Sequence, residues 1–280
     1  LTETQLSAFS NAQLNAMSTT QVKAIQSSDL ASLSLTQLSG LTSSQVAVLS
    51  STQINALSAS QVGSLSSSGL AEWNATQIGA LSSIQVSGLK SIQIVGLSSQ
   101  QIRNLGTVSI SGLKNTQIAS IETADITGLS TAQIVALSAT QVTAFTANQM
   151  KALSSSQVRA IEVRDMGGLT DDDIIAFTSS QLGALTTSQI TVLNTVQVTA
   201  IEIGDLAGFS SIQIAALNSA GIRLLSDDQI AALSTTQIKG IETRDLIVFT
   251  TAQIVALDSA QIQALTLSQV SVLSTTQIAI

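Results

Sequence analysis

Hydrophobic positions recur along this chain every eight residues. With Leu233 at position one of an octad, that position is apolar in all 35 octads, and position six is always Leu, Ile, Val or Met. Position two is Ser, Thr, Asn or Asp in 27 octads, position five is Gln in 26, and position eight is Ala, Gly or Ser in 27. Since no insertion breaks the register, the sequence predicts a single repeat array over residues 1–280.

A period of eight excludes both one long helix and one long strand. A straight α-helix advances about 100° per residue, so each octad would rotate the apolar pair by about 80° around the helix axis. In a strand, positions one and six would lie on opposite faces, and Ala, Gln and Ser are poor strand formers. The chain must therefore change direction once in every octad.

The polar positions indicate how each octad turns. In "LSTTQIKG", residues 233–240, Ser234 and Gln237 form the S-x-x-Q pattern of a capping box, and Leu233 and Ile238 stand at the two ends of a hydrophobic staple. Each octad thus predicts a helix start followed by about six helical residues, or roughly 9 Å. On the capping box alone, replacing Gln237 by Ala should cost about 1 kcal/mol.

Helices this short require neighbours, because isolated helices below about 12 residues are marginal in water. We predict an all-α fold: a compact solenoid of very short helices, one per octad, with positions one and six inside and a small residue at position eight where backbones approach. Position seven carries six of the ten basic residues, which indicates that it faces solvent. The alternative is a β-solenoid, because Ile, Val and Thr are abundant.

A second period, of 40 residues, overlies the octads and is clearest over residues 121–280. In octads such as "IETADITG" and "IETRDLIV", Glu replaces the capping hydroxyl and Asp replaces the glutamine. Four such pairs lie 40 residues apart: Glu122 and Asp125, Glu162 and Asp165, Glu202 and Asp205, and Glu242 and Asp245. The superrepeat either records gene duplication or marks a solenoid turn of five octads, in which the acids would stack in a column.

These acids, with a run of three aspartates, are the candidate metal ligands. Carboxylates presented at every turn would suit Ca²⁺, and Asp171, Asp172 and Asp173 form the densest acidic cluster. Acids in a first helical turn also complement the helix dipole, Arg164 and Arg244 would neutralise two acidic octads, and the cluster lacks the glycine and spacing of an EF-hand loop. We expect a structural role and no metal or other cofactor, with Ca²⁺ as the alternative.

Composition removes most other chemistry. The chain has no Cys, His, Tyr or Pro, so it offers no nucleophile paired with its usual base, and we predict that it is not an enzyme. The ten bases are scattered singly within a net charge of −7, which argues against nucleic acid as a partner. No apolar run reaches the 18 or so residues of a spanning helix, so we expect no membrane insertion. Trp73 occupies position one, where we expect a core residue.

The run "LSTAQIVALSATQVTAF", which begins at Leu129, resembles the long tracts of LTxxQ(I/V)xAL octads in very large bacterial surface or secreted proteins. This resemblance implies a structural segment that is extracellular or on the bacterial cell surface. The GGxGxDxUx nonapeptides of RTX proteins are absent from the sequence, so the calcium-binding β-roll of that class is not implied. The resemblance supplies no functional residues.

Two functions remain after these exclusions. The first is a structural protein, a rigid solenoid rod or fibre-forming segment whose ends stack on one another, so that it self-associates into fibres or filaments. The alternative is a solenoid binding module or adhesin stalk that contacts a protein or glycan. An aromatic content of only 2% argues against this alternative, because interaction surfaces are usually enriched in aromatic residues.

Overall fold

The computed structural model describes residues 2–279, and the regular structure of this part of the chain is entirely helical. Its 33 α-helices and two 3-10 helices have four to six residues each, one helix for every octad. This confirms the predicted all-α solenoid of very short helices. The β-solenoid alternative is wrong, because residues 2–279 contain no strand and position two caps helices instead of making turns between strands.

Contacts within the chain group it into two compact units, Leu1–Phe145 and Thr146–Ile280. The helices of the first unit are α1 (Glu3–Ser7), α2 (Asn11–Asn15), α3 (Thr19–Lys23), α4 (Ser27–Ala31), α5 (Leu35–Ser39), α6 (Ser43–Ala47), α7 (Ser51–Ala56), α8 (Ala59–Val62), α9 (Ser67–Ala71), α10 (Ala75–Gly79), α11 (Ser83–Ser87), α12 (Ser91–Val95), α13 (Ser99–Asn104), α14 (Thr107–Ile110), α15 (Asn115–Ile118), η1 (Thr123–Gly128), α16 (Thr131–Ala136) and α17 (Ala139–Val142). The helices of the second unit are α18 (Ala147–Ala152), α19 (Ser155–Arg159), α20 (Val163–Met166), α21 (Asp171–Ala176), α22 (Ser179–Leu182), α23 (Thr187–Thr191), α24 (Thr195–Thr199), η2 (Ile203–Gly208), α25 (Ser211–Ala216), α26 (Asn218–Ile222), α27 (Asp227–Ala231), α28 (Thr235–Gly240), α29 (Thr243–Leu246), α30 (Thr251–Val255), α31 (Ser259–Ala264), α32 (Leu267–Ser271) and α33 (Thr275–Ile278).

At junctions such as that between α7 and α8, two consecutive extended residues, at positions one and two, end one helix and begin the next, whereas Leu217, before α26, is helical. After α7, Leu57 has φ −74° and ψ 142°, and Ser58, which caps α8, has φ −70° and ψ 164°. No proline is needed for this turn, and among residues 2–279 only Asn218 has a positive φ outside glycine. Asn tolerates that left-handed conformation better than most residues.

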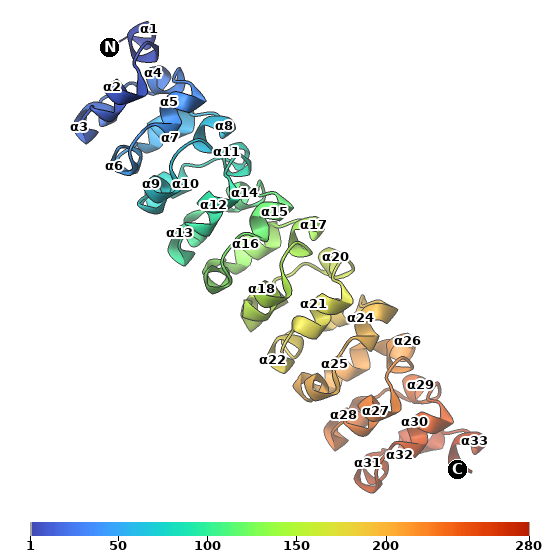
Figure 1. The fold of residues 1–280 in the computed structure, drawn as a ribbon. Coiled ribbons are helices and arrows are strands. Elements are labelled where there is room, and N and C mark those ends of the chain that lie inside the picture. The colour runs from blue at the N-terminus through green and yellow to red at the C-terminus, as the bar shows by residue number, and fades with distance from the viewer. Residues whose placement is uncertain (1, 280) are drawn as a thin grey trace. The chain divides into compact units, whose positions relative to one another are not determined.

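Within each unit, helices pack on the third helix after them in the chain. In the first unit α1 contacts α4, α4 contacts α7, and α6 contacts α9; in the second unit α25 contacts α28, which contacts α31. Figure 1 shows this stacking within each unit. One solenoid turn therefore holds about three octads, and the hypothesis of a five-octad turn is wrong.

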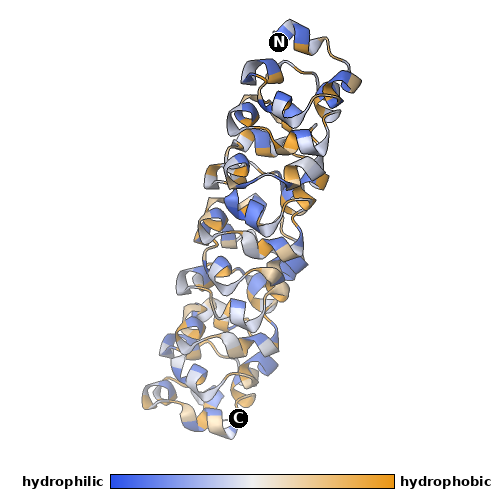
Figure 2. Cartoon of the chain, turned by 90° about the vertical axis from the view of Figure 1, so that its left-hand side faces the viewer, coloured by the Kyte–Doolittle hydropathy of each residue, from blue (hydrophilic) through white to orange (hydrophobic). Residues whose placement is uncertain are grey.

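Positions one and six form the interior of both units. Ile238, at position six, is fully buried, and Leu233, at position one, is 3% exposed. Figure 2 shows hydrophobic and hydrophilic residues alternating within the short helices, as a one-sided interior requires. Trp73 is 2% exposed, which confirms it as a core residue. Position seven is confirmed as a solvent-facing position, with exposed bases such as Lys151 and Arg159.

Position eight is where backbones of successive turns approach, as predicted. A Cβ added at Gly88, Gly112 or Gly208 would overlap the backbone carbonyl oxygen of a residue 29 positions earlier in the chain. For Gly208 that residue is Ser179, at the start of α22, which packs on η2. Glycine at these positions therefore permits close packing between turns.

Candidate functional site

The capping box repeats in most octads of the described chain and has the predicted geometry. At α28 the Ser234 backbone N–H donates to Gln237 Oε1 at 2.7 Å, and the Gln237 backbone N–H donates to Ser234 Oγ at 3.2 Å. The same pair of bonds caps α7, between Ser50 and Gln53. The sequence thus predicts correctly what the glutamine oxygen does.

The glutamine nitrogen has a second role, which the sequence analysis missed. Gln237 Nε2 donates to the carbonyl oxygens of Leu206 and Phe209 at 2.6 and 2.8 Å. These acceptors lie 31 and 28 residues earlier, on the preceding turn of the solenoid. Gln237 is 4% exposed, so its amide joins two turns inside the protein, away from solvent.

This bridge repeats along both units, and we call the set the glutamine ladder. Its members are Gln37, Gln45, Gln53, Gln61, Gln77, Gln85, Gln93, Gln101, Gln117, Gln133 and Gln141 in the first unit, and Gln181, Gln189, Gln197, Gln213, Gln229, Gln237, Gln253, Gln261, Gln269 and Gln277 in the second. Each member donates to the carbonyl 28 residues before it. The cap alone contributes about 1 kcal/mol, and Gln237 makes two further hydrogen bonds to the preceding turn, so we expect Gln237→Ala to cost more than the cap.

A signal for this role was present in the sequence. A capping box accepts Glu as readily as Gln, and Glu would interact better with the helix dipole near the N-terminus. Position five nevertheless holds 26 Gln and no Glu. That bias indicates that the amide must donate a hydrogen bond as well as accept one.

Two other side chains make similar bonds to the preceding turn. Ser109 stands at position five, and its hydroxyl donates to the Leu81 carbonyl, 28 residues earlier, at 2.6 Å. Trp73 Nε1 donates to the Val46 carbonyl at 2.9 Å. The Ser109 hydroxyl thus satisfies a buried carbonyl, whereas the Val46 carbonyl also accepts from the Leu49 backbone N–H, so Trp73 adds a second bond to it.

The acidic octads lack the capping box of their neighbours. The glutamates Glu122, Glu162, Glu202 and Glu242 occupy the N-cap without accepting a side-chain cap bond. Their aspartate partners turn inward: Asp165 and Asp245 are buried, and Asp125 and Asp205 are half-buried.

Serine hydroxyl groups donate hydrogen bonds to some of these acids, and arginines form ion pairs with others. Ser179 Oγ donates to Asp205 Oδ1 at 2.7 Å, and Ser219 Oγ donates to Asp245 Oδ1. Arg244 Nη2 lies 2.6 Å from Glu242 Oε2, and Arg244 Nε lies 3.8 Å from Asp245 Oδ1. Arg244 therefore pairs with the acids of its own octad, as predicted from the sequence.

Asp165 is the least satisfied of these carboxylates. Arg164 pairs with Glu162, and its Nε lies 3.7 Å from Asp165 Oδ1. Asp165 Oδ2 is buried and has no hydrogen-bond partner within the described residues. Burial therefore raises the pKa of Asp165, although Arg164 opposes the shift.

The aspartate cluster at α21 divides between surface and interior. Asp171 and Asp172 are exposed, whereas Asp173 is 5% exposed and accepts from the Thr170 backbone N–H at 2.9 Å, in place of a capping glutamine. Burial raises the pKa of Asp173, and its bonds to Thr170 oppose the shift. Among residues 2–279, no group of three or more acidic side chains is arranged to hold a metal ion.

Each unit also has a surface groove. A groove of about 520 Å³ in the second unit is lined by residues that include Ile175, Ile203 and Glu202, and one of about 450 Å³ in the first unit is lined by residues that include Lys23 and Asn74. Both grooves lie beside positions seven, eight, one, two and three of consecutive octads. The two grooves thus lie at equivalent positions of the octad and differ in the side chains that line them.

Comparison with known proteins gives a family and no named relative. No helix within residues 2–279 has the length and apolar character needed to cross a membrane. No curated protein matches the chain. The ALTTAQ repeat matches at residues 22–59, 118–155, 198–235 and 238–275. These four stretches cover 152 of 280 residues, which is more than half of the chain. The chain therefore belongs to the ALTTAQ repeat family.

Proposed function

We propose that this chain is a structural protein, a rigid solenoid rod or fibre-forming segment of a bacterial surface or secreted protein. The observation that supports this proposal is the glutamine ladder. In each unit, buried amides such as that of Gln93 join one turn to the turn before, with bonds of 3.0 and 2.9 Å to Val62 and Leu65. Bending or stretching the solenoid would break such bonds where water cannot replace them.

The surface of the chain suits the same role. Ser and Thr are the commonest residues at its exposed positions, charges are few, and its two grooves lie at equivalent positions of their octads. A segment whose function is length and stiffness needs a stable interior and a surface that does not aggregate, and it needs no unique pocket.

Small-angle X-ray scattering on the purified chain at low concentration tests the mechanical part of this proposal. A globular protein of 280 residues has a radius of gyration of about 19 Å. About eleven turns spaced about 9 Å apart along one axis would give a radius of gyration of about 30 Å. A value near 19 Å, or a broad distribution of sizes, would contradict a rigid rod.

Antibodies against the purified chain test the location. We expect them to label intact cells of the source organism or to detect the protein in its culture medium. Labelling that requires permeabilised cells would contradict a surface or secreted location and leave the scattering result unaffected.

A further inference from the structure

Two lysines on neighbouring turns of the first unit replace the residues that cap helices elsewhere. Lys90 and Lys114 stand at position two, before α12 and α15, which contact each other. Position two is lysine in no other octad, and in 27 of the 35 it is Ser, Thr, Asn or Asp. A lysine side chain has no acceptor atom, so neither helix has a side-chain cap bond, and a positive charge is unfavourable at a helix N-terminus. Residues that break a local rule in this way usually serve a purpose outside the helix itself.

The two lysines belong to an exposed surface that we call the basic face and define as Lys90, Ile92 and Lys114. All three residues are exposed, and Ile92, in the same octad as Lys90, is 63% exposed. No Asp or Glu occurs in residues 73–121, and all ion pairs among the described residues are made by arginines. Within the monomer, the basic face therefore has no charge partner.

The second unit has a surface of opposite charge, which we call the acidic face and define as Glu202, Ile203, Asp227 and Asp228. Glu202 and Ile203 stand at the start of η2, and the two aspartates begin α27, which contacts η2 from the next turn. All four residues are exposed, Ile203 by 47%. The groove of about 520 Å³ lies beside Glu202 and Ile203. The charges of the acidic face are thus divided between two neighbouring turns, as the lysines of the basic face are.

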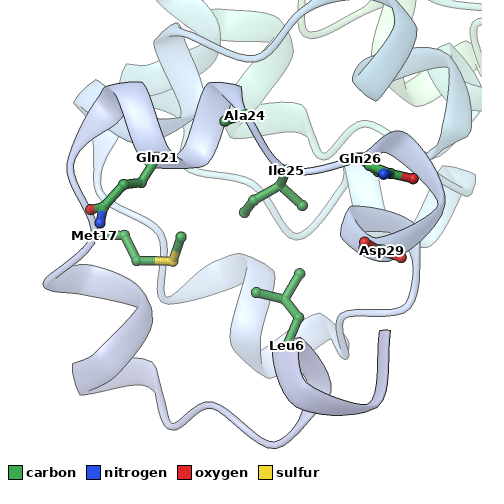
Figure 3. A pocket seen from close by; sticks show the side chains of 7 residues that line it. All are labelled: Leu6, Met17, Gln21, Ala24, Ile25, Gln26 and Asp29. Carbon is green, nitrogen blue, oxygen red and sulfur yellow. The ribbon is translucent and has the colours of Figure 1, made fainter. Parts of the chain in front are cut away.

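A hollow in the first unit matches the basic face less well. Its volume is about 320 Å³, and Figure 3 shows Leu6, Met17 and Ile25 pointing into it. Of the described residues that line it, Asp29 alone is charged. One carboxylate cannot pair with lysines on two turns, so the acidic face is the better complement.

We infer that the basic face of one copy of this chain docks on the acidic face of a second copy. Each lysine then pairs with the acids of one turn and the two isoleucines pack together: Lys90 with Glu202, Lys114 with Asp227 and Asp228, and Ile92 with Ile203. The isoleucines are needed because exposed ion pairs alone contribute little to binding, whereas burial of apolar surface is favourable. At an ionic strength of about 0.1 M, charges more than about 10 Å apart are largely screened, so the charges of the two faces outweigh the net charge of −7.

The contact is heterologous, because the two faces lie on different units of the chain. A copy that has docked through its basic face keeps a free acidic face, so further copies can add and build an open assembly. This inference gives the proposed fibre-forming role its mode of assembly and rests on that role.

Replacing the lysines by the usual capping residue separates docking from folding. Lys90→Ser/Lys114→Ser gives α12 and α15 the cap that most other helices have, so the melting temperature should rise by a few degrees. In sedimentation velocity over a range of concentrations, we expect the parent chain to form oligomers and this variant to associate at least about tenfold more weakly. Lys151→Ser/Lys239→Ser, a control that removes the same charge at two exposed position-seven sites, should associate like the parent.

The acidic face provides the reciprocal variant and the decisive mixture. Glu202→Gln/Asp227→Asn/Asp228→Asn removes the charge of three exposed side chains, keeps their size, and should weaken association to a similar extent. The lysine variant retains its acidic face and the amide variant retains its basic face. At a concentration at which neither variant associates alone, their mixture should therefore form a discrete dimer and nothing larger.

Four results would each overturn the inference: a monomeric parent chain, association unchanged in either face variant, a mixture without dimers, or an equal loss of association in the Lys151→Ser/Lys239→Ser control. A Lys90→Ser/Lys114→Ser variant that melts below the parent would also overturn it, because the lysines would then stabilise the monomer itself. Because the scattering experiment is made on monomers at low concentration, failure here leaves the rod proposal intact, and a compact monomer would refute the rod independently.

Discussion

Removing the side chain of Gln237 tests whether the glutamine ladder stabilises the fold. Gln237→Ala deletes the bonds from Nε2 to the Leu206 and Phe209 carbonyls and the bond that Oε1 accepts from Ser234. Each such bond contributes about 1 kcal/mol net, and a buried group left unpaired costs about 1–3 kcal/mol. With Leu206 fully buried and Phe209 3% exposed, water cannot easily replace the amide. We expect a loss of about 3–5 kcal/mol.

Two further variants separate the ladder from the cap and from packing. Ser234→Ala removes the capping hydroxyl and keeps the amide bridge, so it should cost about 1 kcal/mol. Gln237→Met keeps most of the side-chain volume without a donor, so it should resemble Gln237→Ala if hydrogen bonding dominates. Urea unfolding, followed by circular dichroism at 222 nm, compares the stability of the three variants. Because repeat arrays do not always unfold in one step, hydrogen exchange of the α25 and α28 backbone amides measures the local loss of stability.

The reasoning is refuted if Gln237→Ala and Ser234→Ala unfold at the same urea concentration. The bonds to Leu206 and Phe209 would then contribute nothing beyond the cap. A Gln237→Met variant as stable as the parent would instead show that the side chain acts by filling space.

Four further predictions follow from particular side chains. Ile238→Asp buries an unpaired charge at a fully buried position, so its melting temperature should fall sharply; an unchanged value would show that position six is not interior. Gly208→Ala places a Cβ against the Ser179 carbonyl and should destabilise by about 1–3 kcal/mol, whereas Gly204→Ala in the same helix η2 has no atom within 4 Å of the added Cβ and should be neutral or slightly stabilising; equal urea midpoints would contradict the close approach. Because burial raises the pKa of Asp165 above 3.8, the native state binds its proton more tightly than the unfolded state, and stability falls as pH rises above that value. Asp165→Asn should therefore be more stable than the parent at pH 7, with a difference that narrows toward pH 4 in urea titrations; a constant difference would contradict the shift. Adding a chelator should leave thermal melting unaltered, since no group of acids in residues 2–279 is arranged for a metal, and a large loss of stability would reverse the structural interpretation of the acids.

The parts of the fold that depend on one octad could be predicted from the sequence. The bonds between Ser234 and Gln237 join residues three apart, and helix geometry alone determines them. The buried positions one and six follow equally, because the staple places both on the side away from solvent.

The parts that depend on the number of octads per turn could not be predicted. The bridge from Gln237 to Phe209 exists because three helices make a turn, and a period of eight does not specify how successive helices are oriented. For the same reason the superrepeat suggested a five-octad turn, and the pairing of Asp205 with Ser179, 26 residues earlier, had no local signal.

The equal spacing of donors and acceptors in the ladder has a consequence for how the gene can change. If a whole octad is deleted, each later glutamine meets the equivalent carbonyl of a neighbouring octad, and the bridge to the preceding turn re-forms. If a single residue is lost instead, the glutamine amides of the next turn lie opposite the wrong carbonyls. Unequal recombination in multiples of eight codons can therefore lengthen or shorten this protein while preserving its interior, and the 40-residue superrepeats, five octads each, have a size that such exchange produces.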